Sequence, residues 1–204
     1  MTPAGAGHED ALGVSFTELR PEHFERLRDW LNTPHVYEWW GADATADGLG
    51  GSGDRATTLE AVAAEYLPEI ERGGPAHFHL IVVDATPVGM IQWYPLAAYP
   101  DYAAEIGELD AGTAGVDLLI GDVAHVGRGL GTTAIAAYVE TVVFSAPGIV
   151  RCVGAPDVRN TRSIRAFEKA GFRFVRDAPV TGEAAPEHVM VRERGEVRRP
   201  TIRP

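Results

Sequence analysis

A run of glycines is the first feature of this sequence that could do chemistry. The stretch HVGRGLGTTAIAAYVE (125–140) contains Gly127, Gly129 and Gly131 and continues as an apolar segment that predicts a helix. Glycines let the backbone approach a ligand closely, and the first amide groups of a helix, which lack partners within it, bind anions. The stretch lacks the Lys-Ser or Lys-Thr pair of a P-loop and the glycine spacing of a dinucleotide fold. It predicts either another phosphate-binding loop or a tight strand-to-helix connection.

A carboxylate shortly before the glycines is the second such feature. Asp117 lies in the otherwise apolar segment GVDLLIG (115–121), which predicts a buried strand. An uncompensated carboxylate among apolar side chains costs free energy, which argues that Asp117 has a use. The alternative is a structural role, in which Asp117 accepts hydrogen bonds from backbone amides at a strand bulge.

Charge is distributed unevenly along the chain. The formal net charge is −11, and because the segment at 191–204 is basic, the remainder is more acidic still. Such a surface repels the phosphates of nucleic acids and attracts cations, so we expect no nucleic-acid partner and leave a cationic ligand open. The segment YPDYAAEIGELD (99–110) forms either a solvated face or a trap for polycations. Its acids are Asp101, Glu105, Glu108 and Asp110.

Length and composition indicate a single globular domain. The chain has 204 residues, of which 45% are hydrophobic and 23% charged. It has no apolar run near the roughly 18 residues of a membrane span and no secretory signal, so we expect a cytoplasmic protein with no membrane partner. The lone Cys152 fits a reducing compartment and lies in a predicted core strand. His77 and His79 have metal-like spacing without a third ligand, so we expect no metal.

Hydrophobic periodicity predicts the elements that position these residues. Strands are predicted at 14–20, 114–122, 148–155, 172–177 and 188–194, a hairpin at 77–96, and helices at 21–32, 58–70, 130–144 and 160–172. The glycines lie inside a β-α-β unit. The order predicts an α/β fold with a mixed sheet and helices on it, in one domain at 14–194. We expect flexible tails at 1–13 and 195–204 and a mobile loop at 41–54.

Several separated motifs carry a family resemblance. VGRGLG (126–131) resembles the pyrophosphate loop of the GCN5-related N-acetyltransferases, and NTRSIRAFEKAGF (160–172) resembles their Asn helix and following strand. The resemblance narrows to the aminoglycoside 6′-N-acetyltransferases through EWWG (38–41), TLEAVAAEYLP (58–68), PVGMIQWYPL (87–96), GVDLLIG (115–121) and RGLGT (128–132). It covers roughly residues 14–192.

The resemblance implies a fold, an activity and partners. The fold would be a central, mostly antiparallel sheet flanked by helices. The activity would be transfer of an acetyl group from acetyl-CoA, as co-substrate, to a primary amine of an aminoglycoside antibiotic, the 6′-amine, giving antibiotic resistance. The partner would be a small cationic amine, and the chain a monomer or weak homodimer.

The resemblance also implies roles for individual residues. An aminoglycoside amine is mostly an ammonium ion at neutral pH, so the site needs a group that takes or relays a proton, here Asp117, and oxyanion donors, here the amides of Leu118 or Leu119. Residues expected to bind acetyl-CoA are Leu118, Leu119, Ile120, Val126, Gly127, Arg128, Gly129, Leu130, Gly131, Thr132, Asn160 and Phe167. Residues expected to bind the amine are Trp40, Tyr66, Gln92, Tyr94, Asp101, Glu108, Asp117 and Asp157. Structural alternatives stay open: Asn160 as a plain helix cap, Trp40 as core, and Gln92 and the tyrosines as packed residues.

Three positions depart from the family pattern. Val126 replaces an Arg or Gln, and Phe167 replaces the tyrosine that is often assigned as the acid for the CoA thiolate. Ala155 replaces an acid, for which Asp157 is the expected substitute. Two other functions therefore stay open. One is acetylation of a different amine, such as a hydroxylysine-type siderophore precursor, a polyamine or a peptide amine. The other is binding of CoA or an aminoglycoside with little catalysis. The acidic segment at 99–110 favours an aminoglycoside over a siderophore acid, whose carboxylate it would repel.

Overall fold

A seven-stranded sheet forms the centre of the molecule. The computed structural model describes residues 13–40 and 56–195, so the predicted loop at 41–54 and nearly all of both predicted tails lie outside the described residues. The strand order is β1-β2-β3-β4-β5-β7-β6. The strands are β1 (Val14–Glu18), β2 (His77–Val83), β3 (Thr86–Pro95), β4 (Thr113–Ile120), β5 (Arg151–Gly154), β6 (Arg173–Ala178) and β7 (Glu187–Glu193). Neighbouring strands are antiparallel except β4 and β5, which confirms the predicted mixed, mostly antiparallel sheet.

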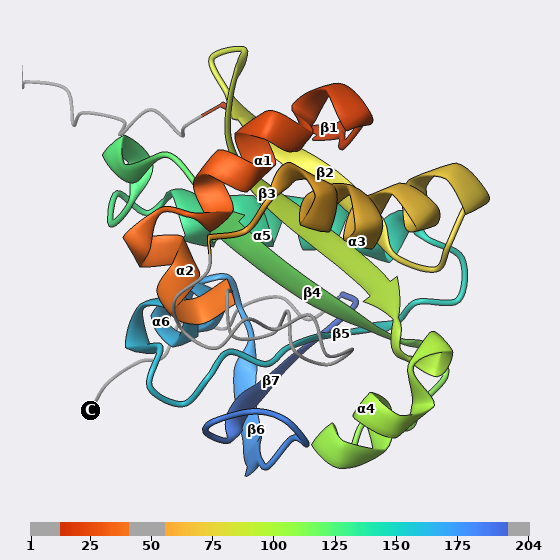
Figure 1. The fold of residues 1–204 in the computed structure, drawn as a ribbon. Coiled ribbons are helices and arrows are strands. Elements are labelled where there is room, and N and C mark those ends of the chain that lie inside the picture. The colour runs from red at the N-terminus through yellow and green to blue at the C-terminus, as the bar shows by residue number, and fades with distance from the viewer. Residues whose placement is uncertain (1–12, 41–55, 196–204) are drawn as a thin grey trace, which may run out of the picture.

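Helices cover both faces of the sheet (Figure 1). They are α1 (Phe24–Leu31), α2 (Pro34–Trp40), α3 (Leu59–Arg72), α4 (Pro100–Ile106), α5 (Leu130–Thr141) and α6 (Thr161–Lys169). Side-chain alternation along the strands divides the core between the two faces. In β2, Leu80 packs with Leu27 of α1, whereas its neighbour Ile81 packs with Ile135 of α5. The strands at the centre are therefore buried on both sides.

Two short helices were missed by the sequence analysis. The paired tryptophans, expected to follow the first helix, belong to α2, and part of the acidic segment forms α4. Pro100 occupies the first turn of α4, and Gly107 ends it with a left-handed φ of 72°. Both are ordinary helix boundary signals, but seven residues are too few for a clear apolar period.

The parallel pair β4 and β5 opens partway along its length. Thr113 pairs with Arg151, Ala114 with Cys152 and Gly115 with Val153. Beyond Gly115, β4 continues beside β3 as far as Ile120, whereas β5 ends at Gly154. The β5-facing edge of the last part of β4 therefore has no strand partner within the described residues.

The histidines and the cysteine noted in the sequence have contacts inside the fold. His79 Nδ1 lies 2.7 Å from the Tyr138 hydroxyl, and the His77 ring stacks on Trp93. Cys152 is buried in β5 as predicted, and burial raises the pKa of its thiol. Among the described residues, the helices are all too short or too polar to span a membrane.

Candidate active site

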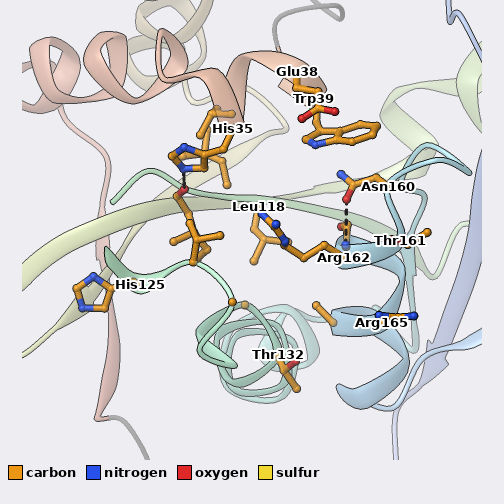
Figure 2. Close-up of a pocket in the computed structure, with 18 of the residues that line it drawn as sticks. His35, Glu38, Trp39, Leu118, His125, Thr132, Asn160, Thr161, Arg162 and Arg165 are labelled. Atoms are coloured by element: carbon orange, nitrogen blue, oxygen red, sulfur yellow. Dashed lines mark hydrogen bonds between the residues drawn. The ribbon is translucent and has the colours of Figure 1, made fainter. Parts of the chain in front are cut away.

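A cavity of about 620 Å³ lies where β4 loses its partner. Its walls are the end of β4, the glycine loop, the start of α6 and the underside of α2 (Figure 2). Predicted residues that line it are Trp40, Leu118, Leu119, Ile120, Val126, Gly127, Gly129, Gly131, Thr132 and Asn160. The fold thus gathers most of the residues expected to bind acetyl-CoA around one space.

The glycine loop presents free amides to this cavity. Gly127 and Gly129 have φ values of 77° and 84°, a region that residues with a Cβ rarely adopt. A Cβ at either position would meet no atom within 4 Å, so the glycines serve the backbone conformation and leave open space beside it. Gly129 is the N-cap of α5 and no side chain caps the helix. Within the described chain, the first amides of α5 therefore keep their hydrogens for an anion.

Cations on α6 face the same cavity. Arg162, Arg165 and Lys169 line it from positions one turn apart, and Figure 2 shows Arg162 reaching toward Leu118. Asn160 caps α6, because its Oδ1 accepts from the amide of Ser163 at 3.0 Å. Arg128, which was expected to contact the pyrophosphate, is exposed and lies outside the cavity lining. The sequence analysis missed the α6 cations, although their three- and four-residue spacing was visible.

The free edge of β4 supplies a further donor. Gly121 donates to the Val88 carbonyl of β3 at 2.9 Å, and in an antiparallel ladder only alternate residues face the same partner. Leu119 therefore bonds toward β3, and Leu118 and Ile120 direct their backbone groups to the open edge. The Ile120 carbonyl is engaged there by His35 Nε2 of α2 at 2.9 Å. Of the two predicted oxyanion donors, Leu118 is the one whose amide faces the cavity.

The side chain of Asp117 lies on the face of β4 opposite to that of Leu118, beside Gln92 and Tyr94. Gln92 Nε2 donates to Asp117 Oδ2 at 3.1 Å, and Tyr94 also hydrogen-bonds to this carboxylate. Burial raises the pKa of Asp117, and both hydrogen bonds oppose that rise. The β3–β4 register shows no shift, so the alternative of an aspartate at a strand bulge does not apply. The three predicted residues form one cluster.

Tyr66 and Trp40 connect this cluster to the cavity. Tyr66 is 1% exposed, and its ring packs edge-on against Phe78. Its hydroxyl hydrogen-bonds with Trp40, which is partly exposed and lines the cavity. Burial raises the pKa of Tyr66, so its hydroxyl is neutral. Tyr66 therefore supports Trp40 from the core and does not itself line the cavity.

Two of the predicted substrate acids are committed to other partners. Glu108 is 5% exposed and forms ion pairs with Arg151 at 2.9 Å and with Arg176 at 3.7 Å. Asp157 is bound by Arg159, whose hydrogen bonds lower the pKa of Asp157. Both expectations are corrected, because each carboxylate is neutralised by an arginine. The partner of Glu108 is distant in sequence, and the partner of Asp157 is two residues away. Asp101 remains exposed on the first turn of α4.

Two predicted cofactor residues belong to the core. Phe167 is 2% exposed and packs edge-on against Phe172. A Cβ at Gly154 would lie 2.3 Å from the Phe167 ring, so the ring covers the end of β5 and does not enter the cavity. Leu130 is 1% exposed within the same core. We therefore correct the expectation that Phe167 and Leu130 contact acetyl-CoA through their side chains.

Two residues near Asp117 were missed entirely. The Tyr102 hydroxyl of α4 donates to Glu187 Oε2 of β7 at 2.9 Å. Burial raises the pKa of Glu187 to about 8, and the negative charges of Asp117, Glu183 and Glu105 add to the rise. No local pattern pointed to this pair, because 85 residues separate its members.

Comparison with known proteins identifies the family. The model of the acetyltransferase (GNAT) domain matches residues 20–180. The chain belongs to the GNAT acetyltransferase family. The aminoglycoside N(6′)-acetyltransferase type 1 of Klebsiella pneumoniae is 32% identical to this GNAT chain over 177 residues, covering 86% of the chain and 81% of that protein.

Solved GNAT structures share the fold. AAC(6′)-Ib in complex with coenzyme A and kanamycin superposes with a TM-score of 0.74 at 29% identity, covering 89% of this chain and 95% of that one. AAC(6′)-Ib with ribostamycin and coenzyme A gives a TM-score of 0.75 at 29% identity, covering 89% and 93%. The predictions of a GNAT fold and an acyltransferase that uses acetyl-CoA are confirmed.

Proposed function

We propose that this GNAT enzyme transfers an acetyl group from acetyl-CoA to the 6′-amine of an aminoglycoside antibiotic and thereby gives resistance. The observation that carries the proposal is the placement of Asp117 beside Gln92 on one face of β4, whereas the next residue, Leu118, packs toward Gly131 in the uncapped first turn of α5. A proton acceptor and an anion cradle are thus separated by one strand. The relatives named for aminoglycoside acetylation support the choice of acceptor.

The cavity has the features that acetyl-CoA requires. The uncapped amides of α5 and the cations Arg162 and Arg165 would hold the diphosphate. The open edge of β4 offers the amide of Leu118 to a carbonyl oxygen. Bound there, acetyl-CoA supplies the acetyl group in an activated thioester.

The acceptor cluster suits an ammonium ion. Asp117 would take the proton that the amine must lose before it can react, and Gln92 and Tyr94 would hold the carboxylate in place. The partly exposed Trp40 would pack on a sugar ring. Asp101, exposed at the start of α4, would attract further amines of the same molecule.

We further propose a single domain at 14–194 that acts in the cytoplasm as a monomer or a weak homodimer. Size-exclusion chromatography with light scattering tests the oligomeric state. A mass near twice that of the 21.9 kDa chain, stable to dilution, would contradict it.

Thiol release by the purified protein tests the function. The assay combines acetyl-CoA with kanamycin, tobramycin, a polyamine, hydroxylysine or a short peptide. We expect release with the aminoglycosides and, by NMR of the product, an acetyl group on the 6′-nitrogen. Thiol release only with another amine would show that this other amine is the substrate and would contradict the proposed aminoglycoside activity. Binding of acetyl-CoA without any release would reduce the protein to a binding role.

A further inference from the structure

The position of Glu187 is unusual for a carboxylate. It begins β7 and forms an isolated bridge with Asp157, while the amide of His188 donates to the Pro156 carbonyl at 2.7 Å. These contacts hold Glu187 opposite Asp157. Ala155, two residues before Asp157, packs in one apolar cluster with Tyr94 and Tyr102. Glu187 is half-buried, and Tyr102 donates to it at 2.9 Å.

Two tyrosine hydroxyls, those of Tyr94 and Tyr102, lie between Asp117 and Glu187. The Tyr94 hydroxyl lies between the other two groups, and its hydrogen bonding lowers the pKa of Asp117 on one side and the pKa of Tyr102 on the other. Tyr102 then donates to Glu187. Three elements, β3, α4 and β7, thus bring their side chains to β4 in one line. The Tyr94 ring is held over Gly115, where a Cβ would lie 2.5 Å from the ring, so this placement of Tyr94 depends on a glycine at that position.

We propose that Glu187 is the final proton acceptor of the amine-binding site, and that the proton passes to it from Asp117 through Tyr94 and Tyr102. The inference rests on the proposed function, because it assigns the destination of the proton that the amine loses. It gives the site a second carboxylate from β7, where Ala155 and the neutralised Asp157 offer none.

The relay conserves every proton. The substrate ammonium gives one proton to the Asp117 carboxylate. The Asp117 carboxyl group then donates to the Tyr94 oxygen as Tyr94 passes its own hydrogen to Tyr102 and Tyr102 passes its hydrogen to Glu187. Asp117 returns to the carboxylate, both tyrosines end neutral, and Glu187 becomes a carboxylic acid that later loses its proton to solvent. The Tyr102-to-Glu187 donor direction found in the structure is the one that this shift requires.

The electrostatic surroundings fit a terminal acceptor. The charged groups acting on Glu187 come from the elements around it: Asp117 on β4, Glu105 on α4 and Glu183 in the turn before β7. Burial is the main cause that raises the pKa of Glu187 to about 8; these negative charges add to the rise, and the hydrogen bond from Tyr102 opposes it. Burial raises the pKa of Tyr94 and Tyr102 well above the usual value, so both relay as neutral hydroxyls. An acceptor works best when its pKa lies near the working pH.

Two variants test the relay with one aminoglycoside. Glu187→Gln keeps the side-chain shape but cannot accept a proton, and Tyr102→Phe breaks the relay while leaving Glu187 in place. We expect either change to lower kcat on the order of tenfold with a smaller change in KM. The inflection of the wild-type pH profile near pH 8 should disappear in Glu187→Gln. The double variant should be no slower than the slower single variant, because both act on one path. Glu25→Gln, on the exposed face of α1, is the matched control.

Infrared titration of the protein without substrates gives a readout independent of activity. We expect a carboxylic acid band that titrates near pH 8 in the wild type and is absent from Glu187→Gln. The relay is overturned if Glu187→Gln keeps that band, or if it keeps the wild-type kcat and pH profile. If the wild type acetylates no amine, the proposed function fails and the relay with it. Normal wild-type turnover with unaffected variants rejects the relay alone.

Discussion

Gln92 lies directly opposite Asp117 in the β3–β4 pairing, and its amide nitrogen donates to Asp117 Oδ2 at 3.1 Å. The bond orients the carboxylate and favours its charged form, against the burial that raises its pKa. Gln92 therefore lowers the pKa of Asp117. This relationship supports a prediction about pH.

Replacing Gln92 should shift the pH dependence of the enzyme. Without the amide donor in Gln92→Leu, the pKa of Asp117 rises further, so the carboxylate loses its charge at a higher pH. The acid limb of the kcat/KM profile should therefore move to higher pH, with acetyl-CoA binding unchanged. Steady-state rates across the pH range check this. An acid limb that stays in place, or moves to lower pH, would show that Gln92 does not tune Asp117.

The cations of α6 should matter more than the one in the glycine loop. Arg162 lines the cavity, whereas Arg128 is exposed outside it. A charge-assisted hydrogen bond contributes roughly 1.5–3 kcal/mol, so Arg162→Gln should raise the Kd of acetyl-CoA by about tenfold or more. Arg128→Gln is the matched control and should change the Kd by less than about twofold. Calorimetry with acetyl-CoA measures both. A larger rise in the Kd for Arg128→Gln than for Arg162→Gln would show that Arg128 of the glycine loop binds the diphosphate.

Glu108 should matter for stability and not for substrate binding. It is buried and paired with Arg151 and Arg176. Removing one partner of a buried pair typically costs about 3–5 kcal/mol, so Glu108→Gln should lower the free energy of unfolding by an amount approaching that range. The KM for an aminoglycoside should stay near that of the parent. Urea unfolding and steady-state kinetics check the two parts. A raised KM at unchanged stability would restore Glu108 to the substrate site.

Local sequence patterns predicted the part of the site that local structure makes. The G-x-G-x-G spacing before a helix identified the loop, and the strand pattern around Asp117 placed it near the loop. The family resemblance predicts Gln92 and Asp117 each as a residue of the substrate site, but their direct pairing across β3 and β4 is found only in the structure.

The remaining site residues could not be predicted, because their roles depend on contacts between segments that are distant in the sequence. Whether Glu108 is free or paired depends on Arg151, which comes 43 residues later in the sequence. Glu187 acquires a role through Tyr102, which is 85 residues away. Phe167 occupies a family position for a proton donor, yet its ring packs over Gly154 in the core. The way the strands and helices pack together determines these partners. Hydrophobic periodicity and charge counts carry no information about that packing.

The central claim is that acetyl-CoA and the proton acceptor occupy opposite sides of the β4 edge and act independently. Asp117→Asn tests it most directly, through kcat with kanamycin and the Kd of acetyl-CoA measured on the same preparation. The account predicts a kcat lower on the order of 100-fold and an unchanged Kd. A variant that turns over as fast as the parent, or that fails to bind acetyl-CoA, would contradict it.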